Sequence, residues 1–267
     1  MGSPYVQLFR SQLKLDILSS LLRGEKRLGT LREELGSSGS TIIHALTDLE
    51  ALKLTEQAGK HYRLTPLGVI EAQLLEEASS AVRVMERFRD FWLRHDIAAI
   101  PGHLLRRIGS LEDSTLVQND SEDLDRVHST FQRILLTSRR VRGISPIFHQ
   151  DFVGVFQRLL EEGATADLIL TRGVLDRTLS LADVDQFVGY VGRGELRIFV
   201  ADDLRVALTV TENSFSMGFF GVDGGYDYSR DLVSNSRRAI MWGEELFTHF
   251  LEGAERLELE DLGLRGG

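Results

Sequence analysis

The sequence predicts an α+β chain in three parts: a small helical head closed by a two-stranded ribbon, a long connecting helix, and a C-terminal α/β sandwich with a mixed sheet. Apolar residues recur at helical spacing up to residue 52 and then alternate with polar ones around Gly59. A helical period returns over residues 67–95. From residue 115 onward, short apolar runs alternate with helical segments, which is the order of a sheet covered by helices.

The head, residues 1–66, is predicted to hold three helices and a hairpin. Residues 1–4 are expected to be a loose end, with Tyr5, Leu8 and Phe9 at or before the start of the first helix. The inward face of that helix is predicted to be Leu15, Ile17, Leu18, Leu21 and Leu22. Thr30 is expected to cap a second helix over residues 31–35, which Gly36 ends. The third helix is predicted to bury Ile42, Ile43, Ala45, Leu46, Leu49 and Leu52.

Two helices joined by a Gly-containing turn, followed by a hairpin around Gly59, suit insertion of the second of these helices into a DNA major groove. This segment resembles the winged helix-turn-helix of archaeal and bacterial transcription regulators, with residues 54–65 as the wing. The Leu-Thr-Pro-Leu-Gly sequence ending at Gly68 is similar to a frequent exit from such wings. The resemblance implies double-stranded DNA as a partner. The alternative is a winged helix that docks onto transcription machinery or another protein without sequence-specific DNA binding.

The residues expected to touch DNA lie on the third helix and on the wing. They are Ser38, Ser40, Thr41 and His44 for bases or phosphates, Arg32 for flanking phosphates, and Lys60, His61 and Arg63 for the backbone or minor groove. No arginine lies within residues 37–52 to make a bidentate contact with guanine. We therefore expect shape readout or weak base specificity.

The net charge of −9, taken over the whole chain, opposes DNA binding, because the neutralisation of phosphates dominates nonspecific affinity. The charge is unevenly divided along the chain. Residues 1–66 hold nine Lys or Arg against seven Asp or Glu, whereas the remaining residues hold 22 against 33. This asymmetry favours a mildly basic DNA-binding head on an acidic body, with an affinity that depends on dimerisation.

Residues 67–112 are predicted to connect the two parts. Pro66 suits the first turn of a helix capped by Thr65 and running to about His95. Its apolar positions are Val69, Ile70, Leu74, Leu75, Ala78, Val82, Met85, Phe88 and Trp92. Either a homodimer or packing against the chain's own second domain would cover such a stripe.

Two further segments carry a resemblance that spans about residues 10–255. HDIAAIPGHLLRRIGSL (residues 95–111) and ISPIFHQDF (residues 144–152) resemble a family of archaeal regulators related to the filament regulator of methanogens. That family places a middle domain after an N-terminal winged helix-turn-helix. The resemblance implies a transcription regulator whose C-terminal part senses a signal of unknown identity.

Residues 113–258 are predicted to form the α/β sensor domain, and residues 259–267 a flexible tail. Strands are expected at 115–118, 140–145 and 166–171, and an antiparallel meander at 194–200, 205–211 and 214–221. Helices are expected from Asp120 or Ser121 to Thr137, over 151–161 and 179–190, and from Ser236 to about Leu257, with Leu124 and Met241 facing inward. This order is similar to the sensor half of archaeal sugar-responsive regulators, which have a phospholipase-D-like fold.

Several motifs that are typical of catalytic sites are absent from the sequence. None of the seven histidines is followed two residues later by the lysine that phospholipase-type chemistry needs. There is no Gly-x-Ser-x-Gly elbow and no Gly-Lys-Ser/Thr phosphate loop, and no histidine pair has the helical spacing of a metal site. We expect no catalytic residue, no cofactor and no metal. The absence of cysteine and of a long apolar run favours a cytoplasmic protein without a membrane partner.

A small-molecule effector is expected at the carboxyl ends of the parallel strands, where open α/β sheets bind ligands. The candidate residues there are Ser145, His149, Thr171 and Arg172, which offer hydroxyls, an imidazole and a guanidinium. The set Phe199, Phe215, Met217, Phe219 and Phe220 is predicted to be core rather than pocket. Tyr226 and Tyr228 are predicted to lie in a loop that is either a lid or a surface turn.

Overall fold

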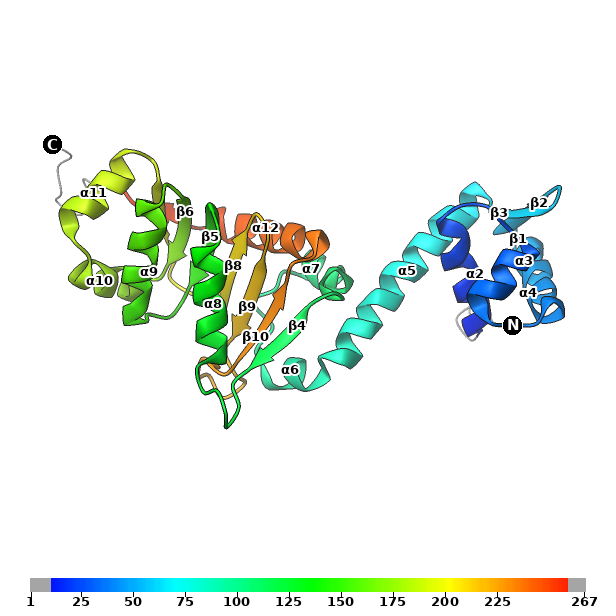
Figure 1. Ribbon diagram of the computed structural model, residues 1–267, viewed down its shortest axis with the longest axis horizontal. Helices are drawn as coiled ribbons and strands as arrows, with labels where there is room; N and C mark the ends of the chain where they lie inside the picture. The colour runs from blue at the N-terminus through cyan, green and yellow to red at the C-terminus, as the bar shows by residue number, and fades with distance from the viewer. Residues whose placement is uncertain (1–10, 259–267) are drawn as a thin grey trace. The chain divides into compact units, whose positions relative to one another are not determined.

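The computed structural model describes residues 11–258, which fall into two compact units, residues 11–82 and 83–258 (Figure 1). The expected loose end, the positions Tyr5, Leu8 and Phe9, and the expected tail over 259–267 lie outside the described residues. Among the helices of residues 11–258, none is both long and apolar enough to cross a bilayer.

The first unit is a winged helix-turn-helix, as the sequence predicts. Its helices are α2 (Gln12–Leu22), α3 (Leu28–Leu35) and α4 (Gly39–Ala51). Strands β2 (Thr55–Ala58) and β3 (His61–Leu64) form the wing around Gly59, whose φ of 62° suits a residue without a side chain. The core of this unit is built from Ile17, Leu18, Leu21, Leu31, Ile42, Leu46, Leu49 and Leu54, all of them buried.

Two details of the predicted head are wrong. Helix α3 begins at Leu28 rather than after a Thr30 cap, because Lys26 and Arg27 form a short strand, β1 (Lys26–Arg27), that pairs with β3. This third strand gives the small sheet the order β1-β3-β2. Ile43 was expected to face inward but is 45% exposed, because α4 turns Ile42 and Leu46 toward the core instead.

Helix α5 (Pro66–Arg87) begins in the first unit and ends in the second. The hydroxyl of Thr65 accepts a hydrogen bond from the Gly68 backbone N–H at 3.0 Å, so Thr65 caps this helix as expected. The predicted single helix to His95 is wrong. Phe88 leaves the helical conformation at φ −111° and ψ 28°, and a separate helix α6 (Arg89–Arg94) follows.

Gly68 is fixed by a close backbone approach. A Cβ at this position would overlap the backbone carbonyl oxygen of buried Leu54, which cannot move as a side chain can. We expect Gly68→Ala to lower the free energy of unfolding of the head by at least about 1–3 kcal/mol. Gly29→Ala is the control, because a Cβ there meets no atom within 4 Å and alanine favours the helix. Urea unfolding followed by circular dichroism compares the two, and equal stabilities would refute this packing account.

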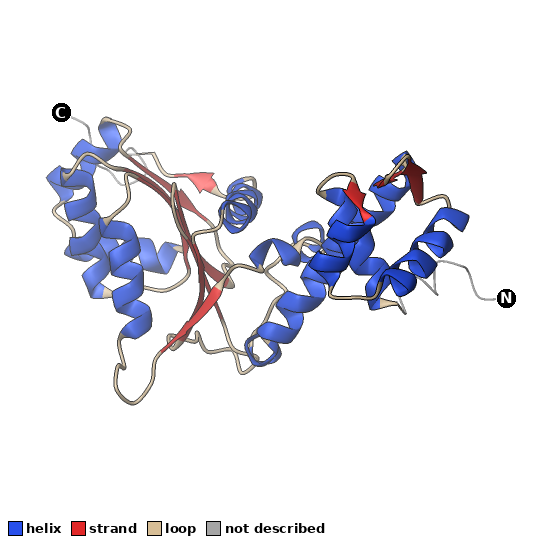
Figure 2. Ribbon diagram, turned by 45° about the vertical axis from the view of Figure 1, so that its right-hand side comes forward, coloured by secondary structure: helices blue, strands red, loops and turns tan. Residues whose placement is uncertain are grey.

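The second unit is a sheet of eight strands between two helical layers (Figure 2). Helices α8 (Arg126–Leu136), α9 (Gln150–Glu161), α10 (Arg172–Leu181) and α11 (Val184–Gly192) cover one face. Helix α12 (Arg237–Leu251) covers the other, together with the short helices α7 (Gly102–Leu105) and η1 (Ile108–Leu111). Trp242 of α12 is fully buried and donates its indole N–H to the carbonyl of Leu104 at 3.0 Å, which ties these segments together.

The sheet is mixed, as predicted. Strands β5 (Arg140–Ser145), β6 (Thr165–Leu170) and β7 (Leu196–Val200) are parallel. Strands β8 (Val206–Thr211), β9 (Phe215–Phe219), β10 (Arg230–Ser234) and β4 (Thr115–Gln118) continue antiparallel beyond β5, and β11 (Glu255–Arg256) pairs with β7 at the other edge. The predicted meander of β7, β8 and β9 is therefore wrong for β7, because β8 pairs with β5 and not with β7.

Several helix boundaries also differ from prediction. Helix α8 begins at Arg126, because the Asp120 carboxylate accepts the N–H groups of Glu122 and Asp123 in a turn and Leu124 stays exposed. The predicted helix 179–190 spans the junction between α10 and α11, where Asp183 starts a new helix by accepting the Gln186 N–H. Helix α12 ends at Leu251, and Met241 is 52% exposed rather than inward.

Candidate functional site

The start of α4 presents a cluster of hydroxyl groups. Ser38 caps the helix by accepting the Thr41 backbone N–H at 3.2 Å, and its Oγ lies 2.9 Å from the Ser40 hydroxyl and 2.7 Å from that of Thr41. His44 is exposed one turn further along. Arg32 is exposed too, and its Cδ would lie 3.3 Å from a Cβ on Gly39. The structure thus brings five of the predicted residues to one end of α4, where the helix dipole favours anions.

The other three predicted residues lie on the wing and differ in whether their side chains are bound to neighbouring side chains. Lys60 is exposed beside the Gly59 turn. Arg63 forms an ion pair with Glu56 across the hairpin, with 2.7 Å between nitrogen and oxygen. His61 is half-buried and accepts a hydrogen bond from Arg27 Nε at 3.1 Å. Lys60 is therefore the least engaged of the three.

Two exposed residues near these groups were missed in the sequence. Arg27 stands opposite His61 because of the two-residue strand β1, which is too short to leave an alternating pattern. Ile43 lies on the outward side of α4 between Thr41 and His44. An apolar residue on this side of a recognition helix can contact a thymine methyl group. On the same helix Asp48 is paired with Lys14 at 2.7 Å, and this hydrogen bond lowers the pKa of Asp48 below its ordinary value.

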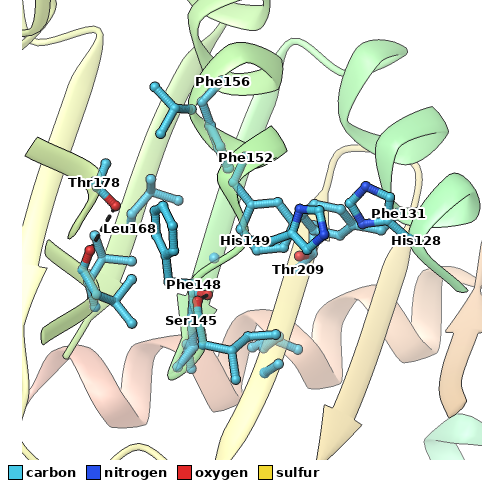
Figure 3. A pocket seen from close by; sticks show the side chains of 18 of the residues that line it. His128, Phe131, Ser145, Phe148, His149, Phe152, Phe156, Leu168, Thr178 and Thr209 are labelled. Atoms are coloured by element: carbon cyan, nitrogen blue, oxygen red, sulfur yellow. Dashed lines mark hydrogen bonds between the residues drawn. The ribbon is translucent and has the colours of Figure 1, made fainter. Parts of the chain in front are cut away.

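A cavity of about 310 Å³ lies between the sheet of the second unit and helices α8–α11. Its floor includes small residues at alternating positions of neighbouring strands, namely Gly143, Ser145, Ala207, Thr209 and Ser216, beside larger residues such as Leu168 and Ile198. Its walls are aromatic, with Phe131, Phe148, Phe152 and Phe156 turned into the space (Figure 3). The rings of Phe131 and Phe152 are 4.9 Å apart. Small floor residues beneath long aromatic walls leave a space that the core does not fill.

The polar end of the cavity contains a buried carboxyl group. Asp231 Oδ2 accepts the Ser216 hydroxyl at 3.0 Å, whereas Oδ1 is enclosed and has no hydrogen-bond partner among the described residues. Burial, opposed by the Ser216 hydrogen bond and reinforced by nearby Asp227, raises the pKa of Asp231 to about 7. Tyr226 lies against the same strand position, Gly218, and burial raises the pKa of its phenol well above the ordinary value. A buried acceptor without a donor is costly unless a ligand supplies one.

The four residues predicted to bind a ligand separate into two pairs. Ser145 and His149 line the cavity. Thr171 and Arg172 are not among its lining residues: the Thr171 hydroxyl caps α10 by accepting the Val174 N–H, and Arg172 is exposed. As expected, the ends of β5 and β6 converge on the cavity, which Ser145 and Leu170 both line, and the cavity also extends under the helices toward β10.

The predicted aromatic core set is not part of the cavity. Phe215, Met217 and Phe219 are fully buried, and none of the five residues lines the cavity. Tyr226 and Tyr228, expected in a lid or a surface turn, both line it, with their rings 4.9 Å apart. The other aromatic residues of the cavity come from α8, α9 and α11 and from the segment between β5 and α9.

Comparison with protein families gives two matches, in separate parts of the chain. The N-terminal domain of the methanogenesis regulatory protein FilR1 matches residues 6–83, and the middle domain of the same protein matches residues 124–253. The methanogenesis regulatory protein FilR1 of Methanothrix harundinacea (strain 6Ac) is 32% identical over 259 residues. The alignment covers 94% of this chain and 57% of that protein, so the chain spans little more than half the length of this relative.

Two solved structures are similar at low sequence identity. One is TrmBL2, an archaeal chromatin protein, with a TM-score of 0.45 and 13% identity over 94% of this chain and 98% of that chain. The other is phosphatidylserine synthase from Haemophilus influenzae Rd KW20, with a TM-score of 0.40 and 10% identity over 54% of this chain and 39% of that chain.

Proposed function

The chain belongs to the family of the methanogenesis regulatory protein FilR1, and from this premise we propose that it is a dimeric, DNA-binding transcription regulator controlled by a small molecule in its α/β unit. The observation that carries the proposal is the exposed hydroxyl cluster at the start of α4, flanked by Arg32. This arrangement suits a recognition helix in the major groove, with phosphates held at its N-terminus.

On DNA, Ser40, Thr41 and His44 face bases or phosphates, and Ile43 offers an apolar contact to thymine. Ser38 and Arg32 meet the flanking backbone. Lys60 and Arg27 reach phosphates beside the wing, while His61 and Arg63 add contacts that first require partial release from Arg27 and Glu56. The weak positive charge of the head implies modest affinity per copy.

The test is charge reversal on the wing. Lys60→Glu combined with Arg63→Glu should weaken duplex binding about tenfold or more and reduce the slope of log affinity against log salt by about one to two. Fluorescence anisotropy of the full chain on a labelled duplex measures both. Arg133→Glu with Arg158→Glu is the matched control, since both residues are exposed in the second unit and the charge change is the same. Retained affinity and slope in the wing variant would remove the wing from the DNA interface.

The same measurement separates the proposal from its rival. A winged helix that docks only onto a protein has no reason to release counterions, so its duplex binding would show no steep salt dependence. Binding without such a slope would favour the protein-docking function.

Dimerisation is supported by an apolar stripe along α5. Leu67, Ile70, Leu74, Ala78 and Val82 follow one another at spacings of three or four residues and are all exposed in the described chain. Ile70 is 58% exposed and Leu74 61%. Such a stripe on a helix is typical of a seam between helices, and a second copy of this chain supplies the same stripe across a two-fold axis.

Ligand control is supported by the cavity. Its walls are aromatic and its polar groups few, which is typical of sites for small molecules. The lone acceptor at Asp231 Oδ1 favours a ligand with an apolar or aromatic body and a cationic or hydrogen-bond-donating group. Ser145 and Thr209 contribute hydroxyls elsewhere in the lining of the same cavity.

A further inference from the structure

We propose that His128, His149 and Asp151 bind one transition-metal dication of the Zn²⁺ class beside the cavity. His128 lies in the first turn of α8, His149 is the N-cap of α9, and Asp151 follows in the first turn of α9. One donor atom from each of the three lies within 4.8 Å of the others. Figure 3 shows the rings of His128 and His149 side by side, and their centroids are 4.3 Å apart.

Two of the three separations between donor atoms match those around a single tetrahedral ion. Asp151 Oδ2 is 3.2 Å from His128 Nε2 and 3.6 Å from His149 Nδ1. Zinc holds nitrogen and carboxylate oxygen at about 2.0–2.2 Å, so two ligands of a tetrahedral ion lie about 3.3 Å apart. The donor atoms of the two imidazoles lie within 4.8 Å of each other. Rotation of the side chains has to bring these two atoms closer by a distance of the order of 1 Å.

The hydrogen bonds within the cluster leave lone pairs facing each other. His149 Nδ1 accepts the Asp151 backbone N–H at 3.3 Å, so it carries no proton, and yet it faces the Asp151 carboxylate. His128 Nε2 lies between that carboxylate and the amide nitrogen of Gln132 at 2.9 Å. A protonated Nε2 can donate to the carboxylate but cannot accept from the amide. An unprotonated Nε2 can accept from the amide but presents a lone pair to the carboxylate. A dication takes the single lone pair of each ring nitrogen and also attracts the carboxylate, so metal–ligand bonds replace the two hydrogen bonds that these nitrogens accept.

The chemistry of the donors selects the class of ion. Two imidazoles and one carboxylate favour Zn²⁺, Co²⁺ or Ni²⁺ over Mg²⁺ and Ca²⁺, which prefer oxygen ligands. All three side chains are partly exposed, at 26%, 40% and 47%, so an ion can enter from solvent. His128 and His149 also line the cavity, which leaves the fourth coordination position to water or to a ligand there.

The test uses the full chain after treatment with a chelator. Isothermal titration calorimetry with Zn²⁺ should give about one saturable site, and Co²⁺ should develop the intense visible absorption of tetrahedral coordination. His128→Gln and Asp151→Asn should each weaken Zn²⁺ binding about tenfold or more. Zn²⁺ should also raise the melting temperature of the unaltered chain, because it binds the folded state, and this increase should shrink in both variants.

His103→Gln provides the control. His103 is exposed in the same unit and faces another histidine, His249, at a ring separation of 6.2 Å. Its loss should leave Zn²⁺ affinity unchanged. Absence of saturable binding, unchanged affinity in the correctly folded His128→Gln chain, or equal weakening by His103→Gln would each overturn the proposal. None of these outcomes bears on DNA binding, which the wing variants test separately.

Discussion

Leu74→Glu should convert the proposed dimer to a monomer and weaken duplex binding by about two orders of magnitude. Leu74 is at the centre of the exposed α5 stripe, between Ile70 and Ala78, and is itself 61% exposed. A carboxylate there meets its own copy across a two-fold seam, so like charges and lost apolar burial both oppose association. Two linked heads gain about 10²–10⁴ in avidity over one head, and this gain disappears with the dimer.

Light scattering coupled to size exclusion reports the mass, and anisotropy reports the DNA affinity. Gln73→Glu is the matched control, because it makes the same change in charge at an exposed position one residue away, on another side of α5. It should remain dimeric. A Leu74→Glu chain with the mass and affinity of the unaltered chain would exclude this stripe as the dimer seam, as would a monomeric unaltered chain at micromolar concentration.

Asp231→Asn should stabilise the protein above neutral pH. The folded pKa of Asp231, about 7, lies above the unfolded value of about 3.9. The folded state therefore keeps a proton that the unfolded state loses, so the contribution of Asp231 to stability is fully present below pH 4 and is lost as the pH rises through 7. The loss at pH 8 is of the order of 2–4 kcal/mol. Asparagine does not titrate and avoids this loss.

Melting temperatures between pH 5 and pH 8 provide the measurement. The curve of the unaltered chain should fall relative to that of Asp231→Asn, while Asp203→Asn, at an exposed position in the same unit, should follow the unaltered chain. Parallel curves for all three would show that Asp231 is ionised in the folded state at pH 5. A group that destabilises the empty protein near neutral pH is typical of a binding site, where stability yields to function.

The sequence revealed the elements whose signal is local. Thr65 and Pro66 mark the start of α5, Gly36 and Gly59 mark turns with positive φ, and the apolar run of β6 predicts a buried parallel strand. Prediction from the sequence failed where the structure of a segment depends on pairing with a segment far away in the chain. Strand β1 exists because Lys26 and Arg27 meet β3, and β8 leaves β7 to pair with β5. Helix α8 starts late because the Asp120 side chain takes the N–H groups that a helix would use.

The candidate sites divide in the same way. The exposed hydroxyls of α4 and the wing cation Lys60 follow from helical period and turn chemistry, so the sequence by itself determined the winged head and the residues it presents. Only the tertiary structure decided that Ser145 and His149 share a cavity with Asp231, that Arg63 is paired with Glu56, and that His128 meets Asp151. These groups come from separate elements, and sheet order and helix packing, which sequence spacing does not encode, bring them within bonding distance.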